Sequence, residues 1–291
     1  MSETPRHSVT IANPGEWLRK IELFRSSGIH SLQVISDWDR TLTAPHTAKG
    51  LDQSTYSLLY NSNLLGTRFN HHSEALYKTY RQIELSTRMD EVEKSARMNE
   101  WWTAQFDLLI AHGFSNAIVK TLLEGGRLTM REGAWEFLRT LNVNLVPILI
   151  LSAGIANVIE EQLWLHGAAT LNVHISANQL TMDPAGIARK YDTPLIHTLN
   201  KASRPARLEL FANAVSLRPN LLLLGDTLED ARMEFVTQHV NVIRIGFLCD
   251  PNLLDRFSYV YDAVVDPDGS FEIANCLLDI YSGEASVSNT G

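Results

Sequence analysis

Two aspartates stand one residue apart where an apolar run ends. They are Asp37 and Asp39, in the stretch VISDWDRTLT from Val34 to Thr43. In extended backbone, residues i and i+2 point to the same side of the chain, so both carboxylates can face one site. Adjacent carboxylates suit a hard divalent cation such as Mg2+, and one can attack phosphorus while the other transfers a proton. Taken alone, the pattern favours a solvated acidic turn, and only its context favours chemistry.

A serine follows the next long apolar run. In LILSAGIANVIEEQL, Ser152 is followed by Ala153, Gly154 and a segment with the apolar period of a helix. The positive end of a helix attracts anions, so the Ser152 hydroxyl and the neighbouring N–H groups can receive a phosphate. The alternative is an ordinary serine that caps the helix.

Charged residues in the second half of the chain complete the set. In LLLLGDTLEDARM, Asp226 and Asp230 lie just past a third apolar run. This position predicts Asp226 as a metal ligand and Asp230 as a supporting residue or weaker ligand. In IHTLNKASRP, Lys201 can supply the positive charge that a phosphate needs in an acidic protein, although most lysines are solvated.

These side chains can form one site only if the strands that precede them end at the same edge of a sheet. Short apolar runs predict strands at 32–36, 145–151, 221–224 and 241–247, with a weaker fifth at 263–265. Most of these runs lack polar alternation, as strands do when helices cover both faces of a sheet. Helical patterns separate the runs, which predicts an α/β fold of three layers with a mainly parallel sheet. Ligands of such sheets lie beyond the carboxyl ends of the strands.

Three helices carry start signals. Asp90 and Glu93 form a capping pair, and Thr129 opens a second capping pattern. Ser203 is predicted to cap a third helix, with Pro205 tolerated in its first turn. These capping signals predict where three of the helices between the strands begin.

The interval from residue 50 to 126 is different, because it holds no convincing strand and much helix. Its longest helical pattern has an apolar stripe that comprises Trp102, Phe106, Leu109 and Ile110. A helical insert after the first strand predicts a lid. The expected domains are an α/β catalytic core of residues 1–49 and 127–291 and a helical cap of residues 50–126. Residues 172–183 are predicted as a hairpin or an irregular segment.

Composition limits the partners. The chain of 291 residues has 33 acidic and 25 basic side chains and a formal charge of -8. This balance argues against a broad surface for nucleic acid or an anionic membrane. Without a signal-peptide pattern or a run long enough to span a bilayer, a cytoplasmic protein is expected. The two cysteines, Cys249 and Cys276, are predicted as buried, reduced thiols.

The order Asp-x-Asp, Ser, Lys, Gly-Asp-x-x-x-Asp resembles the haloacid dehalogenase superfamily of phosphatases. More narrowly, the sequence resembles the type III cytosolic pyrimidine 5'-nucleotidases, a group that includes 7-methylguanosine-phosphate-specific nucleotidases. The resemblance runs from about Gly28 to Ile280 and is carried by SDWDRTLT, YRQIEL, MNEWW, LSAGIANVIEE, IHTLNK, LLLGDTLEDARM and VIRIGF. It implies a Rossmann-like haloacid dehalogenase core with a cap inserted after the first strand.

The resemblance also implies roles for individual residues. Asp37 would be the nucleophile and Asp39 the general acid and base, while Asp37, the backbone carbonyl of Asp39 and Asp226 would bind Mg2+. The phosphate would be held by Ser152, Ala153 and Lys201. Glu84 of YRQIEL matches the glutamate that faces the nucleoside in this group, although its type alone predicts a solvated helix surface. The sequence departs from the group's usual pattern at Trp38, Thr227, Gln105 and Phe106, and the last two bear on base preference.

The implied activity is Mg2+-dependent hydrolysis of nucleoside 5'-monophosphates such as UMP and CMP, with 7-methyl-GMP as a further candidate. A monomer or weak dimer is expected. The same motifs also fit a phosphatase for another small phosphoester, or a nucleoside phosphotransferase that uses the same aspartyl-phosphate. A catalytically silent nucleotide-binding module is the alternative from a different class. The segments YRQIEL and EWW favour a nucleotide as the substrate.

Overall fold

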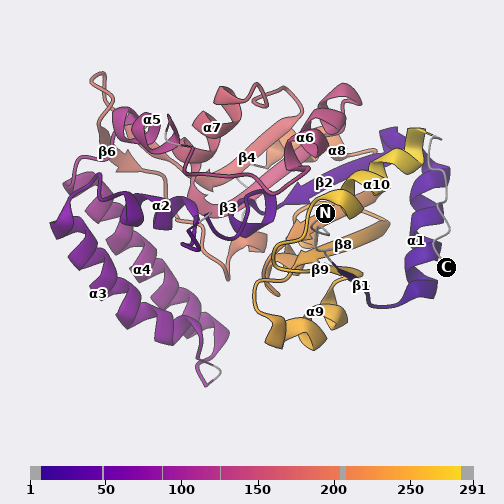
Figure 1. The fold of residues 1–291 in the computed structure, drawn as a ribbon, viewed down its shortest axis with the longest axis horizontal. Coiled ribbons are helices and arrows are strands. Elements are labelled where there is room, and N and C mark those ends of the chain that lie inside the picture. The colour runs from indigo at the N-terminus through magenta and orange to yellow at the C-terminus, as the bar shows by residue number, and fades with distance from the viewer. Residues whose placement is uncertain (1–7, 48, 87, 125, 204–207, 283–291) are drawn as a thin grey trace, which may run out of the picture.

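A seven-stranded sheet forms the centre of the molecule (Figure 1). The computed structural model describes residues 8–282 apart from 48, 87, 125 and 204–207. The strand order is β1-β9-β8-β7-β2-β3-β4, and only β1 runs antiparallel to its neighbour. The strands of this sheet are β1 (Val9–Ile11), β2 (Leu32–Ser36), β3 (Ile148–Ile155), β4 (Val173–Asn178), β7 (Asn220–Gly225), β8 (Asn241–Phe247) and β9 (Ala263–Val265).

The predicted α/β class with a mainly parallel sheet is confirmed. Each of the five predicted runs contributes a strand, and the ranges 32–36, 241–247 and 263–265 are reproduced. The prediction for residues 172–183 is wrong in its first half, because β4 joins the main sheet parallel to β3. Half-buried residues such as His174 lie on this edge strand, so no continuous apolar run marks it. Only the second half forms a hairpin, in which β5 (Leu180–Met182) pairs with β6 (Ala188–Tyr191).

Helices cover both faces of the sheet. Side chains alternate along the buried strands, so that Val34 and Leu222 belong to one apolar cluster while Ile35 and Leu221 belong to the other. The first cluster packs against α1 (Pro14–Ser27), α6 (Ala134–Val143), α7 (Ala156–Leu165) and α10 (Glu272–Ser282). The second packs against α8 (Glu209–Val215) and α9 (Leu254–Val260). The result is the three-layer arrangement that the sequence predicts.

A run of helices follows β2 before the chain returns to the sheet at β3. It comprises α2 (Thr55–Ser62), α3 (Thr67–Glu84), α4 (Glu91–Ala111), α5 (Asn116–Glu124) and α6. In Figure 1, α3 and α4 lie side by side and extend away from the sheet. The Asp90 cap is confirmed, because its carboxylate accepts from Val92 and Glu93 N–H groups, both at 3.0 Å. The helical insert after the first buried strand is thus present, while the boundaries at 50 and 126 remain a prediction.

Two other helix starts differ from the predictions. Helix α6 starts after Gly133, which has φ 79°, and Thr129 instead donates its N–H and hydroxyl to Gln53. Ser203 lies in the short 3-10 helix η3 (Lys201–Ser203), and α8 begins after Leu208. Pro205 lies outside the described residues. At Thr129 the local capping signal yields to a tertiary contact with Gln53.

Two smaller points complete the fold. Cys249 is half-buried and Cys276 is exposed, so the prediction that both thiols are buried is wrong for Cys276, which lies on the outward side of α10. Within residues 8–282, as far as they are described, no helix is long and apolar enough to cross a membrane. The remaining short helices are η1 (Ile29–Ser31), η2 (Trp38–Leu42), η4 (Asp230–Val236) and η5 (Pro251–Leu253).

Candidate active site

The carboxyl ends of three adjacent strands bring the predicted residues together. Strand β2 lies between β3 and β7, and Ser36 is level with both Ile150 and Leu224. Asp37 follows β2 directly, and its N–H donates to the Leu224 carbonyl at 3.0 Å. Asp226 follows β7, and Ser152 lies on β3, so all three side chains reach the same edge of the sheet.

Lys201 lies between two buried aspartates. Its Nζ donates to Asp37 Oδ1 at 2.7 Å and to Asp230 Oδ1 at 2.8 Å. The second oxygen of Asp230 accepts from the N–H groups of Asp226 and Thr227 at 3.1 and 3.0 Å. Because both oxygens of Asp230 accept hydrogen bonds, this residue fixes the ammonium group and the turn at Asp226 relative to Asp37. Lys201, predicted from a weak signal, is only 5% exposed.

Asp39 makes a different set of contacts. Its Oδ1 accepts from the Thr55 N–H at 2.9 Å, and its Oδ2 accepts from the Thr55 hydroxyl at 3.3 Å. The same hydroxyl accepts from the Ile155 N–H at 3.1 Å. A Cβ placed on Gly154 would lie 2.5 Å from Thr55 Oγ1, 3.0 Å from Asp39 Oδ2 and 3.1 Å from Ser152 Oγ. These contacts require glycine at position 154 and show how tightly the site is packed there.

Ser152 is not an ordinary helix cap. It lies within β3, and α7 begins only at Ala156. Its hydroxyl accepts from the Gly154 N–H at 3.0 Å, and it is 1% exposed. Ser152 and the half-buried Ala153 both line the cavity described below. Ser152 and Ala153 therefore reach the cavity from the carboxyl end of β3, and not from the N-terminus of α7.

Arg40 joins the metal-ligand candidate Asp226 to the segment before α2. Its Nε donates to Asp226 Oδ2 at 3.1 Å and its Nη1 donates to Asp52 Oδ1 at 3.3 Å. The backbone of Arg40 is left-handed, with φ 63°, which is uncommon for a residue with a side chain. The surrounding structure must therefore hold this turn.

Arg131 supplies that support. Its side chain is 3% exposed and donates to the Arg40 carbonyl at 2.6 Å and to the Thr41 carbonyl at 3.2 Å. It also donates to the carbonyls of Pro267 and Gly269, both at 2.8 Å. One guanidinium thus ties the turn that follows Asp37 to the segment between β9 and α10.

The carboxylates of the site have perturbed pKa values. Burial raises the pKa of Asp37 well above its usual range, and repulsion from Asp230 and Asp226 adds to this while Lys201 opposes it. Burial likewise raises the pKa of Asp226, against the attraction of Arg40. Burial raises the pKa of Asp39 to about 6, and the hydrogen bond from Thr55 limits the rise. A pKa of about 6 lies closer to neutral pH than that of an ordinary carboxyl, which suits a group that exchanges protons.

Three carboxylates converge on one point. Ligand atoms of Asp37, Asp226 and Asp230 lie within 4.8 Å of one another, and all three residues are buried. Buried oxygens that repel one another are the donor set that a hard divalent cation prefers. The residues present therefore fit a metal such as Mg2+. Both oxygens of Asp230 accept hydrogen bonds, one from Lys201 and the other from two backbone N–H groups. Lys201 engages Oδ1 of Asp37 and Arg40 engages Oδ2 of Asp226, so Asp37 and Asp226 are the better side-chain ligands.

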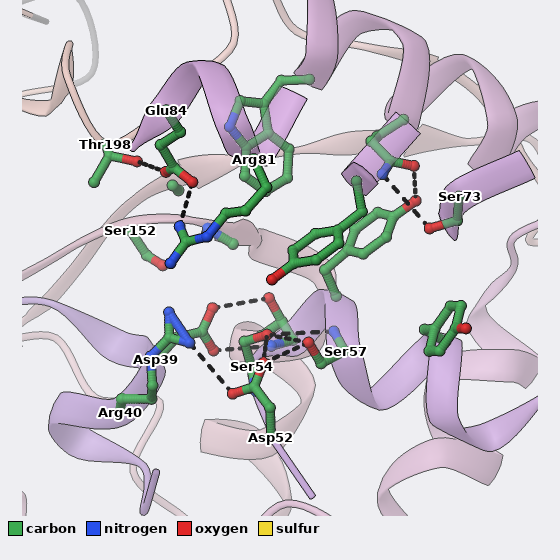
Figure 2. A pocket seen from close by; sticks show the side chains of 18 of the residues that line it. Asp39, Arg40, Asp52, Ser54, Ser57, Ser73, Arg81, Glu84, Ser152 and Thr198 are labelled. Carbon is green, nitrogen blue, oxygen red and sulfur yellow. Dashed lines mark hydrogen bonds and ion pairs between the residues drawn. The ribbon is translucent and has the colours of Figure 1, made fainter. Parts of the chain in front are cut away.

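A cavity of about 650 Å3 opens above these carboxylates. Figure 2 shows Asp39, Arg40 and Asp52 on one side of it and Arg81 and Glu84 on the other. Aromatic side chains contribute much of the wall, namely Tyr56, Tyr60, Tyr77, Trp101 and Trp102. A cavity with aromatic walls and charged groups at its floor and on its α3 side has the dimensions and chemistry of a small-molecule site.

Glu84, predicted from the resemblance, lies at this cavity and touches both the insert and the core. Its Oε1 accepts from the Thr198 hydroxyl at 3.1 Å, and its Oε2 accepts from Arg81. Gln105 and Phe106, the two departures from the group's pattern that bear on base preference, lie in different environments. Gln105 lines the cavity and accepts from the Tyr56 hydroxyl, while Phe106 is buried in the core.

Sequence reasoning missed several residues of the site. Arg40 had a signal, because it stands inside the SDWDRTLT motif. Arg81 had one too, because it stands inside YRQIEL. Thr55 had none, because the sequence does not show which loop approaches Asp39. Trp101 and Trp102 are favoured as core residues by the sequence, and the structure places both at the cavity wall as well.

The sheet and the aspartates at its edge define the class of protein, which is a hydrolase with the haloacid dehalogenase fold. A haloacid dehalogenase family hydrolase from Salmonella enterica serovar Typhi superposes with a TM-score of 0.58 at 13% identity, over 92% of this chain and 81% of that one. At that identity the likeness concerns the fold alone.

The family model described as pyrimidine 5'-nucleotidase (UMPH-1) matches residues 41–281, so the chain belongs to this family of 5'-nucleotidases. The human 7-methylguanosine phosphate-specific 5'-nucleotidase is 30% identical over 281 residues, which cover 96% of this chain and 94% of the relative. The crystal structure of cytosolic 5'-nucleotidase IIIB bound to cytidine superposes with a TM-score of 0.83 at 25% identity, over 94% of each chain.

The raised pKa of Asp39 predicts a pH-dependent stability difference. Its ordinary pKa is 3.8 and its value in the fold is about 6. The folded state therefore binds this proton more tightly, and stability falls as pH rises from about 4 to 6. In EDTA, Asp39→Asn should gain about 1 to 3 kcal/mol in unfolding free energy relative to wild type between pH 4 and pH 7. Urea denaturation at several pH values measures this, and a difference that stays constant with pH would contradict it.

Proposed function

We propose that the protein hydrolyses nucleoside 5'-monophosphates to nucleoside and phosphate in a Mg2+-dependent reaction. UMP and CMP are the proposed substrates, with 7-methyl-GMP as a further candidate. The observation that supports this most directly is Asp37, held by Lys201 beside Asp226 at the floor of a cavity with aromatic walls. The carboxylates and Lys201 at the floor suit a metal and a phosphate, and the aromatic wall suits the base of a nucleotide.

The proposed reaction has two steps. Asp37 attacks the phosphorus in line, and Asp39 donates a proton to the departing ribose 5'-oxygen, which leaves an aspartyl-phosphate on Asp37. Asp39, now ionised, accepts a proton from the water that hydrolyses this ester, so that phosphate leaves and both aspartates return to their first state. The pKa of about 6 supports this role, because Asp39 can both lose and regain a proton near neutral pH.

Charge neutralisation is the other requirement, since the phosphoryl transition state spreads negative charge over its oxygens. Lys201, the Ser152 hydroxyl and the backbone at Ala153 would hold the phosphate. Asp37, the backbone carbonyl of Asp39 and Asp226 would hold Mg2+, with Asp230 behind them. When bound, the ion offsets the repulsion among the carboxylates and the phosphate oxygens.

The insert has a proposed role of its own. Residues 50–126 would act as a cap that recognises the nucleoside through Glu84 and excludes water until the nucleoside has left. A cytoplasmic monomer or weak dimer is proposed, and the similarity to cytosolic 5'-nucleotidase IIIB supports the compartment.

A panel of phosphate esters with and without Mg2+ tests the function. We expect phosphate release from UMP and CMP at least 100-fold faster than from phosphoserine, and a loss of at least about 100-fold when EDTA removes the metal. Readdition of Mg2+ after EDTA should restore the rate, which controls for damage to the protein. Faster hydrolysis of phosphoserine would favour the alternative of another small phosphoester, and a new monophosphate formed from an added nucleoside would identify a phosphotransferase.

A further inference from the structure

The insert side of the cavity carries four charged side chains, and they form two pairs. Lys78 lies 2.6 Å from Glu74, and Arg81 pairs with Glu84. All four line the cavity. Among the described residues of this wall, every carboxylate therefore has a cation beside it. The wall offers a ligand no net negative charge.

The pair formed by Arg81 and Glu84 determines which charge this wall presents to a bound nucleoside. Both oxygens of Glu84 are engaged, one by Arg81 and the other by the Thr198 hydroxyl at 3.1 Å. The side chain of Glu84 is 18% exposed and that of Arg81 is 43% exposed. Figure 2 shows the Arg81 guanidinium reaching into the opening below Glu84. A guanidinium has five N–H donors, and Glu84 takes only some of them.

We propose that Arg81 is a specificity residue that makes the cavity select a neutral base over a cationic one. This inference rests on the proposed function and narrows its substrate class to pyrimidine nucleoside monophosphates. Uracil and cytosine are uncharged and present carbonyl oxygens that accept from guanidinium N–H groups. The ring of 7-methylguanine carries a positive charge, which Arg81 repels and which finds no unpaired carboxylate, because Arg81 already neutralises Glu84.

Replacing Arg81 tests this selection. The substitution Arg81→Gln keeps a good helix former but removes the charge, so Glu84 is released toward the ligand. We expect the ratio of kcat/KM for 7-methyl-GMP to kcat/KM for UMP to rise about 10-fold. Arg81→Lys, which keeps the positive charge, should leave the ratio within about 3-fold of wild type.

The chain offers a matched control. Arg97 and Glu100 form another pair three residues apart on the insert, at 3.0 Å, and neither lines the cavity. Arg97→Gln should leave both rates within about 2-fold of wild type. The double variant Arg81→Gln with Glu84→Gln should lose the gain, since no carboxylate is released. An unchanged ratio in Arg81→Gln, or an equal loss on both substrates, would overturn the inference.

Equilibrium binding separates this inference from the proposed function. Uridine and 7-methylguanosine lack the phosphate, so their dissociation constants, measured by isothermal titration calorimetry, do not depend on turnover. Tighter binding of uridine, reversed toward 7-methylguanosine by Arg81→Gln, supports the inference even if UMP is not hydrolysed. Tighter binding of 7-methylguanosine by the wild type would overturn the inference while leaving a nucleotidase function intact.

Discussion

Asp37→Asn should reduce kcat/KM for UMP, CMP and 7-methyl-GMP alike by more than about 10,000-fold. An amide cannot displace the ribose oxygen from phosphorus, so no aspartyl-phosphate can form. The variant should remain folded, because its amide oxygen can still accept from Lys201 Nζ, which lies 2.7 Å from Asp37 Oδ1. The substitution also removes one of three mutually repelling carboxylates.

The measurements for this variant are steady-state phosphate release and thermal unfolding. Asp255→Asn, which changes an exposed aspartate in the first turn of α9, provides the control and should retain wild-type activity. Retention of more than about 1% of wild-type activity by Asp37→Asn on any of the three nucleotides would exclude Asp37 as the nucleophile.

Lys201→Met should damage both stability and turnover. The change leaves Asp37 and Asp230 buried without their shared cation, and breaking a buried ion pair costs about 3 to 5 kcal/mol of unfolding free energy. Loss of a cation that faces the transferring phosphoryl group should lower kcat about 100-fold to 1,000-fold. Both effects follow from the position of one ammonium group between two aspartates.

The pH dependence of this second variant gives a sharper test. Aspartates raise the pKa of Lys201, so the stabilisation by this cation is fully present at neutral pH. The deficit of Lys201→Met in EDTA should shrink as the solution is acidified, because Asp37, whose pKa is raised by burial, is then more readily protonated. Lys120→Met on the exposed side of α5 is the control. A deficit under about 1 kcal/mol at pH 7 would contradict the proposed network.

Much of the sheet could be predicted because its strands are apolar on both faces. The runs in β3 and β7 are continuous, and those in β2 and β8 are interrupted only by Gln33 and Arg244. Strand β4 could not be found this way, since it lies at the sheet edge and its first residues are only half-buried. The start of α6 was missed for a related reason. Thr129, which matches a capping pattern, donates to the distant Gln53 instead.

The convergence of Asp37 and Asp226 could be predicted because each follows a strand, and parallel strands end at one edge. The requirement that Asp226 and Lys201 lie near Asp37 is met, with carboxylate atoms within 4.8 Å and an ammonium at 2.7 Å. Contacts that depend on loop geometry could not be predicted from the sequence. The bond from Thr55 to Asp39 joins residues 16 positions apart, and Arg40 reaches Asp226 only because its backbone is left-handed.

The position of Arg131 has a consequence for how the protein is made. Its guanidinium ties the loop after Asp37 to Pro267 and Gly269, which the ribosome adds near the end of synthesis. A nascent chain that already contains every proposed catalytic aspartate still lacks two of the four acceptors that hold Arg131. The complete set of bonds that holds this loop can therefore form only after translation has passed residue 269.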